Sequence, residues 1–344
     1  MLLTIGMPTY DDFDGVYFSI QALRMYHDLT DCEILVIDNH PNPSPELENV
    51  CNSTKVRYVK APHLSGTCAT SQAVFDYAEG EFVLCMDCHI LFEKDSLTRL
   101  KKYLRENPQS PDLLQGPLLY DDLQNTATHF DPIWRDHMWG TWGNDSRVNG
   151  NEPFDIPMQG LGVFAMRKAA LPGFNRLFKG FGGGEGYIHE KVRQRGGRTL
   201  CLPWFKWVHR FGRPKGVPYP LVLEDRIFNY IIGHQELGLS LRPVIEHFKD
   251  KVSPEVLASV IADVSQYSAK DQIMRGSIAA SIATRKLNCV SLGPVIDRAS
   301  CNCSGKFVHA CEKHVKCRPF TKLEDGIISC QECKDYEPED PVQN

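Results

Sequence analysis

Strand-like and helical patterns alternate along the first ninety or so residues, and this alternation limits the fold more than any other feature of the chain. A strand that alternates with a helix is typical of βαβ units, in which a crossover helix joins two parallel strands. The predicted strands cover residues 2–7, 33–38, 56–59 and 81–86, and the predicted helices cover 16–26, 46–51, 70–78 and 94–105. We therefore expect an α/β fold with a mainly parallel sheet and flanking helices.

The rest of the chain contains an irregular segment, further elements and a Cys-rich tail. Residues 109–157 show little periodicity, which is typical of a lid or binding loop, or of a surface insertion whose aromatic residues pack into the core. Extended runs follow at 160–166, 199–202 and 204–211, and helices are predicted at 187–195, 221–237 and 254–265. We expect three parts, which are a main domain at 1–218, a helical extension at 219–286 and a Cys-rich module at 287–344.

Two potential metal ligands follow the fourth predicted strand. Asp87 and His89 lie two positions apart where the apolar run 82–86 ends. Alternate residues of a strand point to the same side, so both can reach one cation at the carboxyl edge of the sheet, where α/β folds bind ligands. A carboxylate and a neutral imidazole suit Mn²⁺ or a similar ion that bridges protein and phosphates. Taken alone, such a pair is more often a turn-forming Asp beside a half-exposed His.

Polar residues also end the first two predicted strands. Asp38 closes the second strand, and Pro8, Thr9 and Tyr10 close the first. A carboxylate there can accept hydrogen bonds from a ribose or a base, and the Tyr ring can stack on a base. Each residue alone reads as a strand-to-loop cap. Because the carboxyl ends of parallel strands share one edge, the three strand ends together favour a nucleotide site.

A glycine-rich run at 180–186 presents Glu185 at the start of a predicted helix. Gly182, Gly183 and Gly184 permit positive φ or the close approach of a ligand. The run is no phosphate-binding P-loop, because no Gly-Lys-Ser or Gly-Lys-Thr follows it. Glu185 is a candidate general base. Its structural alternative is a carboxylate that the helix dipole favours at a helix N-terminus.

A second candidate metal ligand, His209, lies 120 positions beyond His89. A single His in such an extended run is usually structural. Arg210, Arg213 and Lys215 follow it closely, and they place positive charge where a departing diphosphate needs it.

These motifs together resemble the GT-A glycosyltransferases of the family 2 type, in their order and in their rough spacing. The Asp-x-His pair and the downstream Gly-Gly-Glu are most similar to those of the polypeptide N-acetylgalactosaminyltransferases and the β-1,4-galactosyltransferases. The resemblance covers roughly residues 1–215 and implies a GT-A, Rossmann-like fold. Gly186 departs from those families, whose motif continues with Asn or Asp. The motifs are Pro8-Thr9-Tyr10, Val36-Ile37-Asp38-Asn39, Asp87-x-His89, Gly182-Gly183-Gly184-Glu185 and Val208-His209-Arg210.

The resemblance implies a role for each matching residue. Asp38 would contact the uridine, and Glu185 would face the acceptor hydroxyl, as a base in inverting relatives or as a positioning group in retaining ones. The metal ligands for Mn²⁺ (or Mg²⁺) on the nucleotide diphosphate would be Asp87, His89 and His209. The donor-binding residues that we predict are Pro8, Thr9, Tyr10, Asp38, Gly66, Asp87 and Arg210.

Cysteines crowd into the last part of the chain at spacings that allow tetrahedral metal binding. Two ligands separated by two residues can meet one ion, so we expect a structural Zn²⁺ site, with room for two. An iron–sulfur cluster and disulfides are the alternatives. The predicted zinc ligands are Cys301, Cys303, Cys311, His314, Cys317, Cys330 and Cys333.

The sequence therefore predicts a metal-dependent glycosyltransferase, which transfers a hexosyl or N-acetylhexosaminyl group from a nucleotide sugar, most simply a UDP-sugar, to an unidentified acceptor hydroxyl. One alternative is a sugar-nucleotide nucleotidyltransferase, although the first loop lacks the glycine-rich basic sequence that cradles a triphosphate. The other is a non-catalytic, zinc-containing interaction protein on a degenerate GT-A fold.

The overall charge and hydropathy narrow the range of partners. The formal net charge of −5 gives no general attraction to nucleic acid or to anionic membranes, although Lys residues in the tail keep a nucleic-acid partner open. No apolar window approaches the length that spans a bilayer, and the N-terminus lacks the basic region of a signal peptide. We expect a cytoplasmic protein, or a protein of the host cytosol if the source is viral.

Overall fold

The computed structural model describes residues 1–212 and 216–266, together with the backbone of four short strands nearer the C-terminus. The chain separates into two compact units, Met1–Val264 and Ser265–Asn344. In the second unit, β15 (Leu292–Asp297) pairs with β16 (Phe307–Cys311) and β17 (Thr321–Lys322) pairs with β18 (Ile328–Ser329), both antiparallel. Of the predicted zinc ligands, Cys311 ends β16, and the other six lie outside the described residues.

The first unit is built on an eight-stranded sheet with the order β11-β13-β6-β12-β4-β1-β2-β3. β3, β2, β1 and β4 are parallel neighbours, as the alternating pattern predicts. The strands of this sheet are β1 (Leu3–Thr9), β2 (Cys32–Asp38), β3 (Arg57–Lys60), β4 (Phe82–Met86), β6 (Leu113–Gln115), β11 (Phe154–Asp155), β12 (Val163–Arg167) and β13 (Thr199–Cys201).

The sheet is mixed, so the expectation of a mainly parallel sheet holds in part: β6 and β13 also pair in parallel, but other neighbours do not. β12 lies antiparallel to both β4 and β6, and β11 lies antiparallel to β13. In the register of β12 and β4, Val163 pairs with Met86, so β12 begins at the edge where β4 ends. The segment before β12 therefore arrives at the carboxyl edge of β4, and β12 then runs in the direction opposite to β4.

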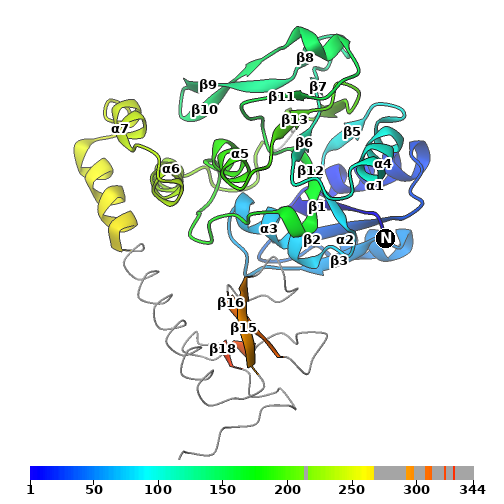
Figure 1. Cartoon of the computed structure of the whole chain (residues 1–344), viewed down its shortest axis with the longest axis horizontal. Coiled ribbons are helices and arrows are strands. Elements are labelled where there is room, and N and C mark those ends of the chain that lie inside the picture. Colours follow the sequence, from blue (N-terminus) through cyan, green and yellow to red (C-terminus); the bar gives the residue numbers. More distant parts are fainter. Residues whose placement is uncertain (213–215, 267–291, 298–306, 312–320, 323–327, 330–344) are drawn as a thin grey trace, which may run out of the picture. The chain divides into compact units, whose positions relative to one another are not determined.

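Helices cover both faces of the sheet (Figure 1). Successive strand residues alternate between two buried clusters, because side chains of a strand point to opposite faces. Leu35 and Ile37 pack into the cluster that includes residues of α3, α5 and α6, whereas Val36 packs into the cluster of α1, α2 and α4. The helices are α1 (Phe13–Tyr26), α2 (Pro45–Thr54), α3 (Thr67–Tyr77), α4 (Ser96–Glu106), α5 (Glu185–Gln194), α6 (Leu223–Leu237), α7 (Arg242–Phe248) and a last one at 254–266, with 3₁₀ turns at Ser146–Asn149 and Lys168–Ala170.

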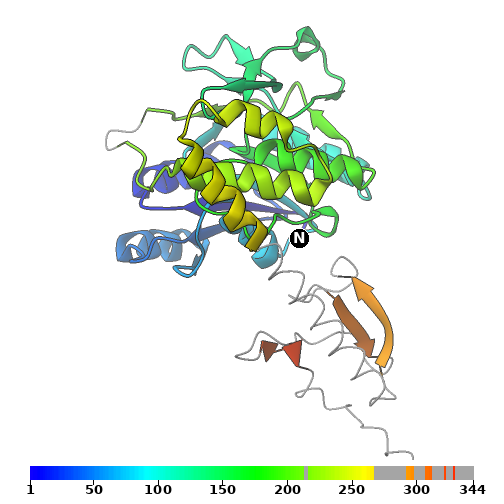
Figure 2. The same cartoon turned by 90° about the vertical axis from the view of Figure 1, so that its left-hand side faces the viewer.

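The segment predicted to be irregular forms several short strands. β9 (His129–Arg135) and β10 (Met138–Gly143) make an antiparallel hairpin with a register shift between Trp139 and Thr141. Trp134 and Trp139 of this hairpin pack against the buried cluster that contains residues of α6 and α7. Figure 2 shows α6 and α7 in yellow from a second side. Short strands with an irregular register give little alternation, which is why the sequence pattern did not reveal them.

A second, four-stranded sheet brings distant residues together. Its order is β5-β14-β7-β8, with β5 (Ile90–Phe92), β14 (Trp207–His209), β7 (Leu118–Leu119) and β8 (Thr126–Ala127). β14 runs antiparallel to β5, and His209 pairs with Ile90. This pairing places the predicted third metal ligand beside the turn that carries Asp87 and His89.

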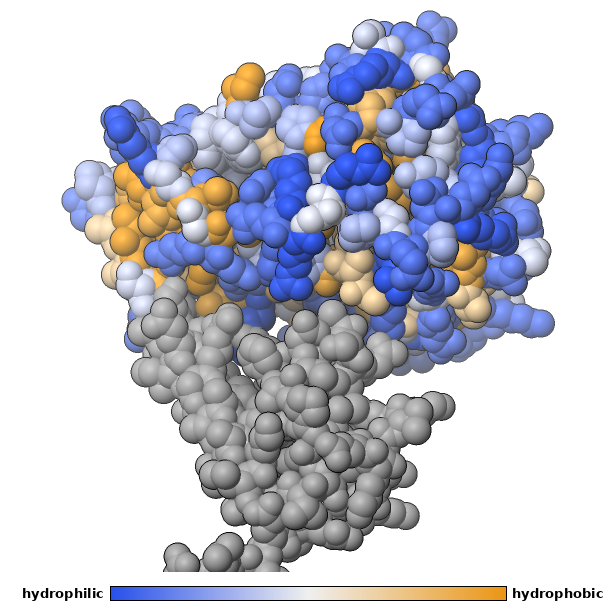
Figure 3. All heavy atoms as spheres, in the orientation of Figure 1, coloured by the Kyte–Doolittle hydropathy of each residue, from blue (hydrophilic) through white to orange (hydrophobic). Residues whose placement is uncertain are grey.

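The surface of the described residues is mostly hydrophilic, with one broader apolar area in the view of Figure 3, over the region where α6, α7 and the helix of residues 254–266 lie. Among the described helices, none combines the length and the apolar character needed to cross a membrane.

Candidate functional site

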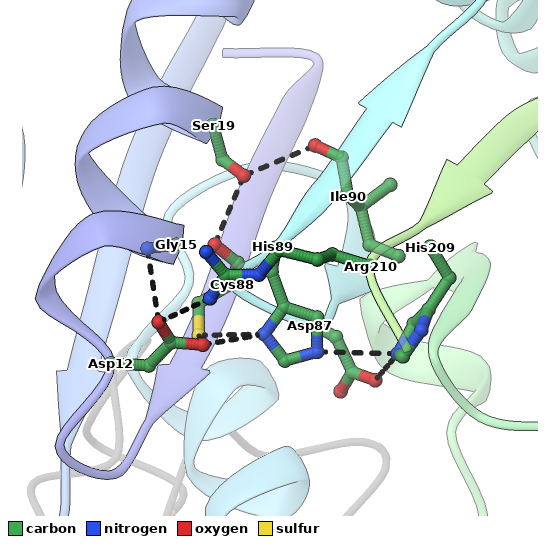
Figure 4. A network of polar contacts seen from close by, with 9 residues as sticks. All are labelled: Asp12, Gly15, Ser19, Asp87, Cys88, His89, Ile90, His209 and Arg210. Carbon is green, nitrogen blue, oxygen red and sulfur yellow. Dashed lines mark hydrogen bonds and ion pairs between the residues drawn. The ribbon is translucent and has the colours of Figure 1, made fainter. Parts of the chain in front are cut away.

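The turn between β4 and β5 is held in place by two neighbouring elements (Figure 4). The backbone N–H of Asp87 donates to the carbonyl of Gly162 at 2.7 Å. On the other side, the hydroxyl of Ser19 lies within hydrogen-bond distance of the carbonyls of Cys88, at 3.0 Å, and of Ile90, at 3.1 Å. Ser19 is buried in α1, so this helix fixes the turn that presents Asp87 and His89.

Asp87, His89 and His209 meet at the carboxyl edge of β4. Nε2 of His209 lies 3.2 Å from Nε2 of His89 and 3.2 Å from Oδ2 of Asp87. One ligand atom from each residue can be chosen so that all lie within 4.8 Å of one another. The side chains of His89 and His209 are 6% and 12% exposed, whereas that of Asp87 is 41% exposed. The cluster is therefore closed on its histidine side and open on its carboxylate side.

The donor set fits a divalent cation. Ligand atoms bound to one ion at about 2.1 Å lie roughly 3 to 3.5 Å apart, which matches the separations in this cluster. Two imidazoles and a carboxylate suit Mn²⁺ and other borderline divalent ions. Nδ1 of His209 is buried and has no hydrogen-bond partner among the described residues.

Asp12 is a site residue that the sequence reading did not identify. It caps α1, because its Oδ1 accepts a hydrogen bond of 3.0 Å from the N–H of Gly15. Its Oδ2 lies 2.8 Å from Nδ1 of His89, and Oδ1 accepts a second bond of 2.7 Å from Nη2 of Arg210. Burial raises the pKa of Asp12, but its bonds with His89, Gly15 and Arg210 outweigh burial and hold this pKa below its usual value.

Arg210 lies beside the metal cluster and is fixed by it. Its backbone N–H donates to the carbonyl of His89 at 3.2 Å, and its guanidinium pairs with Asp12. The side chain is 37% exposed, so its positive charge is accessible from solvent. The other two predicted cations, Arg213 and Lys215, lie outside the described residues.

The predicted nucleotide edge is formed by the ends of β1 and β2, where Thr9 pairs with Asp38. Asp38 is 2% exposed and accepts hydrogen bonds from the Tyr58 hydroxyl, at 2.6 Å, and from the N–H of His40, at 2.9 Å. A carboxylate has about four acceptor positions, so Asp38 keeps capacity for a further donor.

Aromatic rings extend this edge beyond Pro8 and Thr9. The ring of Tyr10 lies 4.8 Å from that of His40 and 6.1 Å from that of Tyr219, edge-on in both cases. Phe181, from the glycine-rich run, lies 5.9 Å from Tyr219. Rings from three separate segments therefore surround the strand ends that we predicted to bind a base.

Gly66 connects the nucleotide edge to the glycine-rich run. It precedes α3 with φ of 85°, and the next N–H, of Thr67, donates to the carbonyl of Gly180 at 3.0 Å. A Cβ atom at Gly66 would lie 2.7 Å from that carbonyl oxygen. Only glycine permits this backbone conformation and this approach without strain.

Asn229 of α6 holds the glycine-rich run and is a second residue that the sequence reading missed. Its side chain accepts a hydrogen bond from the N–H of Lys179 at 2.8 Å and donates to the carbonyls of Lys179, at 2.6 Å, and Gly182, at 2.8 Å. Gly182 and Gly183 adopt positive φ, of 96° and 86°. The run therefore has a fixed shape, which α6 supports from below.

Glu185 is the first residue of α5, as the sequence pattern predicts to within two positions. Burial raises the pKa of its carboxyl group, an effect that the helix N-terminus and Arg226 oppose and that the charge of Asp87 reinforces.

Gly186 stands where the families that the chain resembles have Asn or Asp, and its surroundings explain the small residue. A Cβ atom at this position would lie 3.0 Å from Cδ1 of Trp139 and 3.1 Å from Sδ of Met158. Trp139 is itself fixed, because its backbone N–H donates to the hydroxyl of Tyr230 at 2.8 Å. The β9–β10 hairpin thus fills the space into which an Asn or Asp side chain at position 186 would project.

His189 anchors α5 from beneath. It is fully buried, and its Nδ1 contacts the carbonyl of Glu185 while its Nε2 contacts Gln115, at 2.7 Å, and the N–H of Gln159, at 3.2 Å. Burial lowers the pKa of His189 to about 3, so the ring is neutral at physiological pH. This network fixes the first turn of α5, from which Glu185 projects.

Comparisons with known proteins bear on the family and the fold. The family model described as glycosyl transferase family 2 matches residues 4–171. Among solved structures, GalNAc-T7 with UDP, GalNAc and Mn²⁺ is 13% identical, with a TM-score of 0.57; the match covers 73% of this chain and 54% of that one. The chain thus spans about half the length of that protein. No curated protein matches the sequence.

Two further solved structures are similar at a lower level. The mannosyltransferase PcManGT from Pyrobaculum calidifontis, in complex with GDP-Man and Mn²⁺, is 13% identical with a TM-score of 0.45, covering 82% of this chain and 79% of that one. TarS from S. aureus, in complex with UDP-GlcNAc, is 15% identical with a TM-score of 0.47, covering 77% and 81%. Residues 4–171 thus match the glycosyl transferase family 2 model, and the likeness to GalNAc-T7 shows a GT-A-like α/β fold with a mixed sheet.

Proposed function

We propose that this protein is a metal-dependent glycosyltransferase that moves a sugar from a nucleotide sugar, and specifically from a UDP-sugar, to an acceptor hydroxyl. The observation that carries the proposal is the cluster of Asp87, His89 and His209 at the carboxyl edge of β4. Asp87 and His89 lie within the segment 4–171 that matches the glycosyl transferase family 2 model, and His209 joins them from β14. The presence of UDP and Mn²⁺ in the GalNAc-T7 structure supports UDP as the nucleotide.

The metal side of the site would bind the diphosphate. Asp87, His89 and His209 would hold Mn²⁺ or Mg²⁺, and the ion would neutralise the charge that develops on the leaving diphosphate. Arg210 adds a second positive charge, which Asp12 orients through a 2.7 Å bond. A guanidinium is well suited to phosphate oxygens because its donors lie in one plane.

The nucleoside would lie along the ends of β1 and β2. Tyr10 supplies a ring for stacking, and Asp38 supplies the carboxylate that would accept a hydrogen bond from the uridine. Thr9 is 3% exposed, and its hydroxyl has no partner among the described residues. Pro8 and Gly66 would shape the backbone of this edge.

Glu185 would act on the acceptor. The raised pKa of its carboxyl group favours proton uptake, which is what an inverting glycosyltransferase requires of its base. We propose a hexosyl or N-acetylhexosaminyl transfer. The parts 1–218, 219–286 and 287–344, and a structural zinc ion in the last, stay predictions.

Thermal-shift measurements on the full chain test the proposal. UDP should raise the melting temperature of the wild-type protein in the presence of Mn²⁺ and much less in its absence. Asp87→Ala should abolish that difference and lower Mn²⁺-dependent hydrolysis of a UDP-sugar more than about a hundred-fold, since a catalytic metal contributes several kcal/mol. Asp250→Ala, which removes an exposed carboxylate, is the matched control.

Two outcomes would contradict the proposal. A wild-type protein that gains no stability from UDP and Mn²⁺ together is not a donor-binding enzyme, and it would fit the interaction-protein alternative. Unchanged turnover by Asp87→Ala would show that the cluster is not the catalytic metal site.

A further inference from the structure

Asp12 is the point at which three elements of the site join. It lies at the N-terminus of α1, where it caps the helix, and its two oxygens also contact His89 of the β4–β5 turn and Arg210 after β14. The side chain of Asp12 is only 10% exposed. A helix cap needs only one carboxylate oxygen and can be exposed to solvent. Capping therefore does not explain why Asp12 is buried or why its second oxygen contacts His89.

The contact with His89 determines which ring nitrogen carries the proton. An ionised carboxylate only accepts hydrogen bonds, so the nitrogen that faces Asp12 at 2.8 Å, Nδ1, must carry the proton. In the neutral form of the ring, this tautomer leaves Nε2 unprotonated. This is the nitrogen that faces His209 and the cluster, and a metal binds only an unprotonated imidazole nitrogen (Figure 4).

The contact of Asp12 with Arg210 holds a cation beside the metal cluster. Oδ1 of Asp12 accepts from Nη2 of Arg210 at 2.7 Å, and Nε of Arg210 is buried without a partner among the described residues. The guanidinium is thus fixed by one carboxylate, while its accessible part remains available to a ligand. Asp12 therefore orients a metal ligand and a cation with the same carboxylate group.

We propose that Asp12 is a positioning residue of the metal site, which sets the tautomer of His89 for metal binding and couples that ligand to Arg210. The inference rests on the proposed function, because it assumes that a divalent ion binds to Asp87, His89 and His209. Carboxylates that hold the distal nitrogen of a metal-binding His commonly contribute 10-fold to 100-fold in metal affinity.

A competing interpretation assigns a second ion to Asp12 itself. Asp12, Cys88 and His89 also place three potential ligand atoms within 4.8 Å of one another. Sγ of Cys88 lies 3.8 Å from Oδ2 of Asp12 and 3.5 Å from Nδ1 of His89. The 2.8 Å contact between Asp12 and His89 favours a shared proton over a bound ion. The two interpretations make opposite predictions for Cys88→Ala.

Asp12→Asn separates positioning from helix capping. Asn caps helices about as well as Asp, so α1 keeps its N-terminal hydrogen bond. The Asn side chain has one acceptor oxygen and a donor amide, so it cannot accept from Gly15, His89 and Arg210 together. If the amide faces His89, Nδ1 becomes the acceptor and the proton moves to Nε2, where it blocks the metal.

The measurement is Mn²⁺ binding to the full chain by electron paramagnetic resonance, which needs no donor and no turnover. We expect Asp12→Asn to raise the dissociation constant 10-fold to 100-fold, with the melting temperature of the metal-free protein little changed. Ser44→Ala, which removes the side-chain cap of α2, is the matched control: it should lower stability and leave Mn²⁺ affinity unchanged. Cys88→Ala should also leave that affinity unchanged.

A spectroscopic readout follows the tautomer directly. In ¹⁵N-detected histidine spectra of the metal-free protein, His89 should carry its proton on Nδ1, and Asp12→Asn should populate the form protonated on Nε2. His89→Gln identifies the signal by its loss. A merely structural role for Asp12 would move neither the tautomer nor the metal affinity.

The outcomes separate this inference from the proposed function. A wild-type protein that binds no Mn²⁺ overturns both. A wild-type protein that binds Mn²⁺, with Asp87→Ala deficient and Asp12→Asn normal, overturns only the role of Asp12. Equal losses of affinity in Asp12→Asn and Cys88→Ala would assign the ion to the second cluster and also overturn it.

Discussion

The side of the site that carries Asp87, His89 and His209 is a polar network, whereas the side that carries Glu185 is lined mainly by aromatic and apolar groups. Around the histidines, the polar neighbours Asp12, Ser19 and Arg210 supply hydrogen bonds. Beside the glycines that flank Glu185, Cys68, Leu161 and Phe174 lie close to the position of a Cβ at Gly184, and Trp139 and Met158 lie close to that at Gly186.

This difference separates two chemical tasks. A cation and a diphosphate need fixed charges and donors, which the polar side supplies. A base needs a carboxylate whose charged form is disfavoured, and burial on the apolar side has that effect on Glu185.

Glu185→Gln should produce the largest change on the apolar side. The amide keeps the shape of the side chain but cannot take up a proton, so the transfer rate should fall about 10²-fold to 10⁴-fold. Steady-state kinetics and UDP binding should be measured together. Donor binding should be unchanged, because the polar side is intact. An equal loss of donor affinity would remove the distinction between the two sides.

Asn229→Ala should have the next largest effect, on stability. The change removes three side-chain hydrogen bonds to the backbone of Lys179 and Gly182, and it should lower the free energy of unfolding by about 2–4 kcal/mol. Urea denaturation measures this loss. Asn151→Ala, which removes one exposed hydrogen bond, is the control and should change stability by less than about 0.5 kcal/mol.

Gly186→Asn tests whether the hairpin fills the space beside Glu185. The new side chain would meet Trp139 and Met158, so we expect a loss of about 1–3 kcal/mol from overpacking. Trp139→Ala in the same chain should recover part of that loss. If Gly186→Asn leaves the melting temperature unchanged, Trp139 does not exclude a larger side chain at position 186.

The pH dependence of the transfer rate should show the effect of burial on Glu185, and this effect should be smaller than those of the substitutions above. Burial raises the pKa of Glu185 above its ordinary value of 4.5, so the carboxyl group stays protonated to a higher pH than an exposed one. A base acts only when ionised; the transfer rate should therefore fall up to tenfold per pH unit below this raised pKa. Glu185→Gln should lose this acidic limb. A limb that persists in the variant belongs to another group.

The parts of the structure that local sequence patterns could predict are those that depend on near neighbours. The four parallel strands follow from βαβ alternation, and the positions of Asp87 and His89 follow from the end of an apolar run. The antiparallel β12 was not predictable in this way, because its direction depends on where the preceding segment lies relative to β4.

Asp12 and Asn229 could not be found from the sequence for the same reason. Asp12 reads as an ordinary helix cap, and its partners His89 and Arg210 lie 77 and 198 positions away. Asn229 lies within a predicted amphipathic helix, and its partners are backbone groups of a loop about fifty positions earlier. In each case the function of the side chain depends on tertiary packing.

The separation of 120 positions between His89 and His209 also bears on the order of folding. During synthesis, the parallel strands β1 to β4 can pair well before β14 leaves the ribosome, since chains fold from the N-terminus as units are completed. The ion-binding cluster is complete only when β14 adds to β5. A nascent chain that ends before β14 would therefore possess the parallel strands yet lack one of the three proposed ligands, so metal binding would report that synthesis had passed β14.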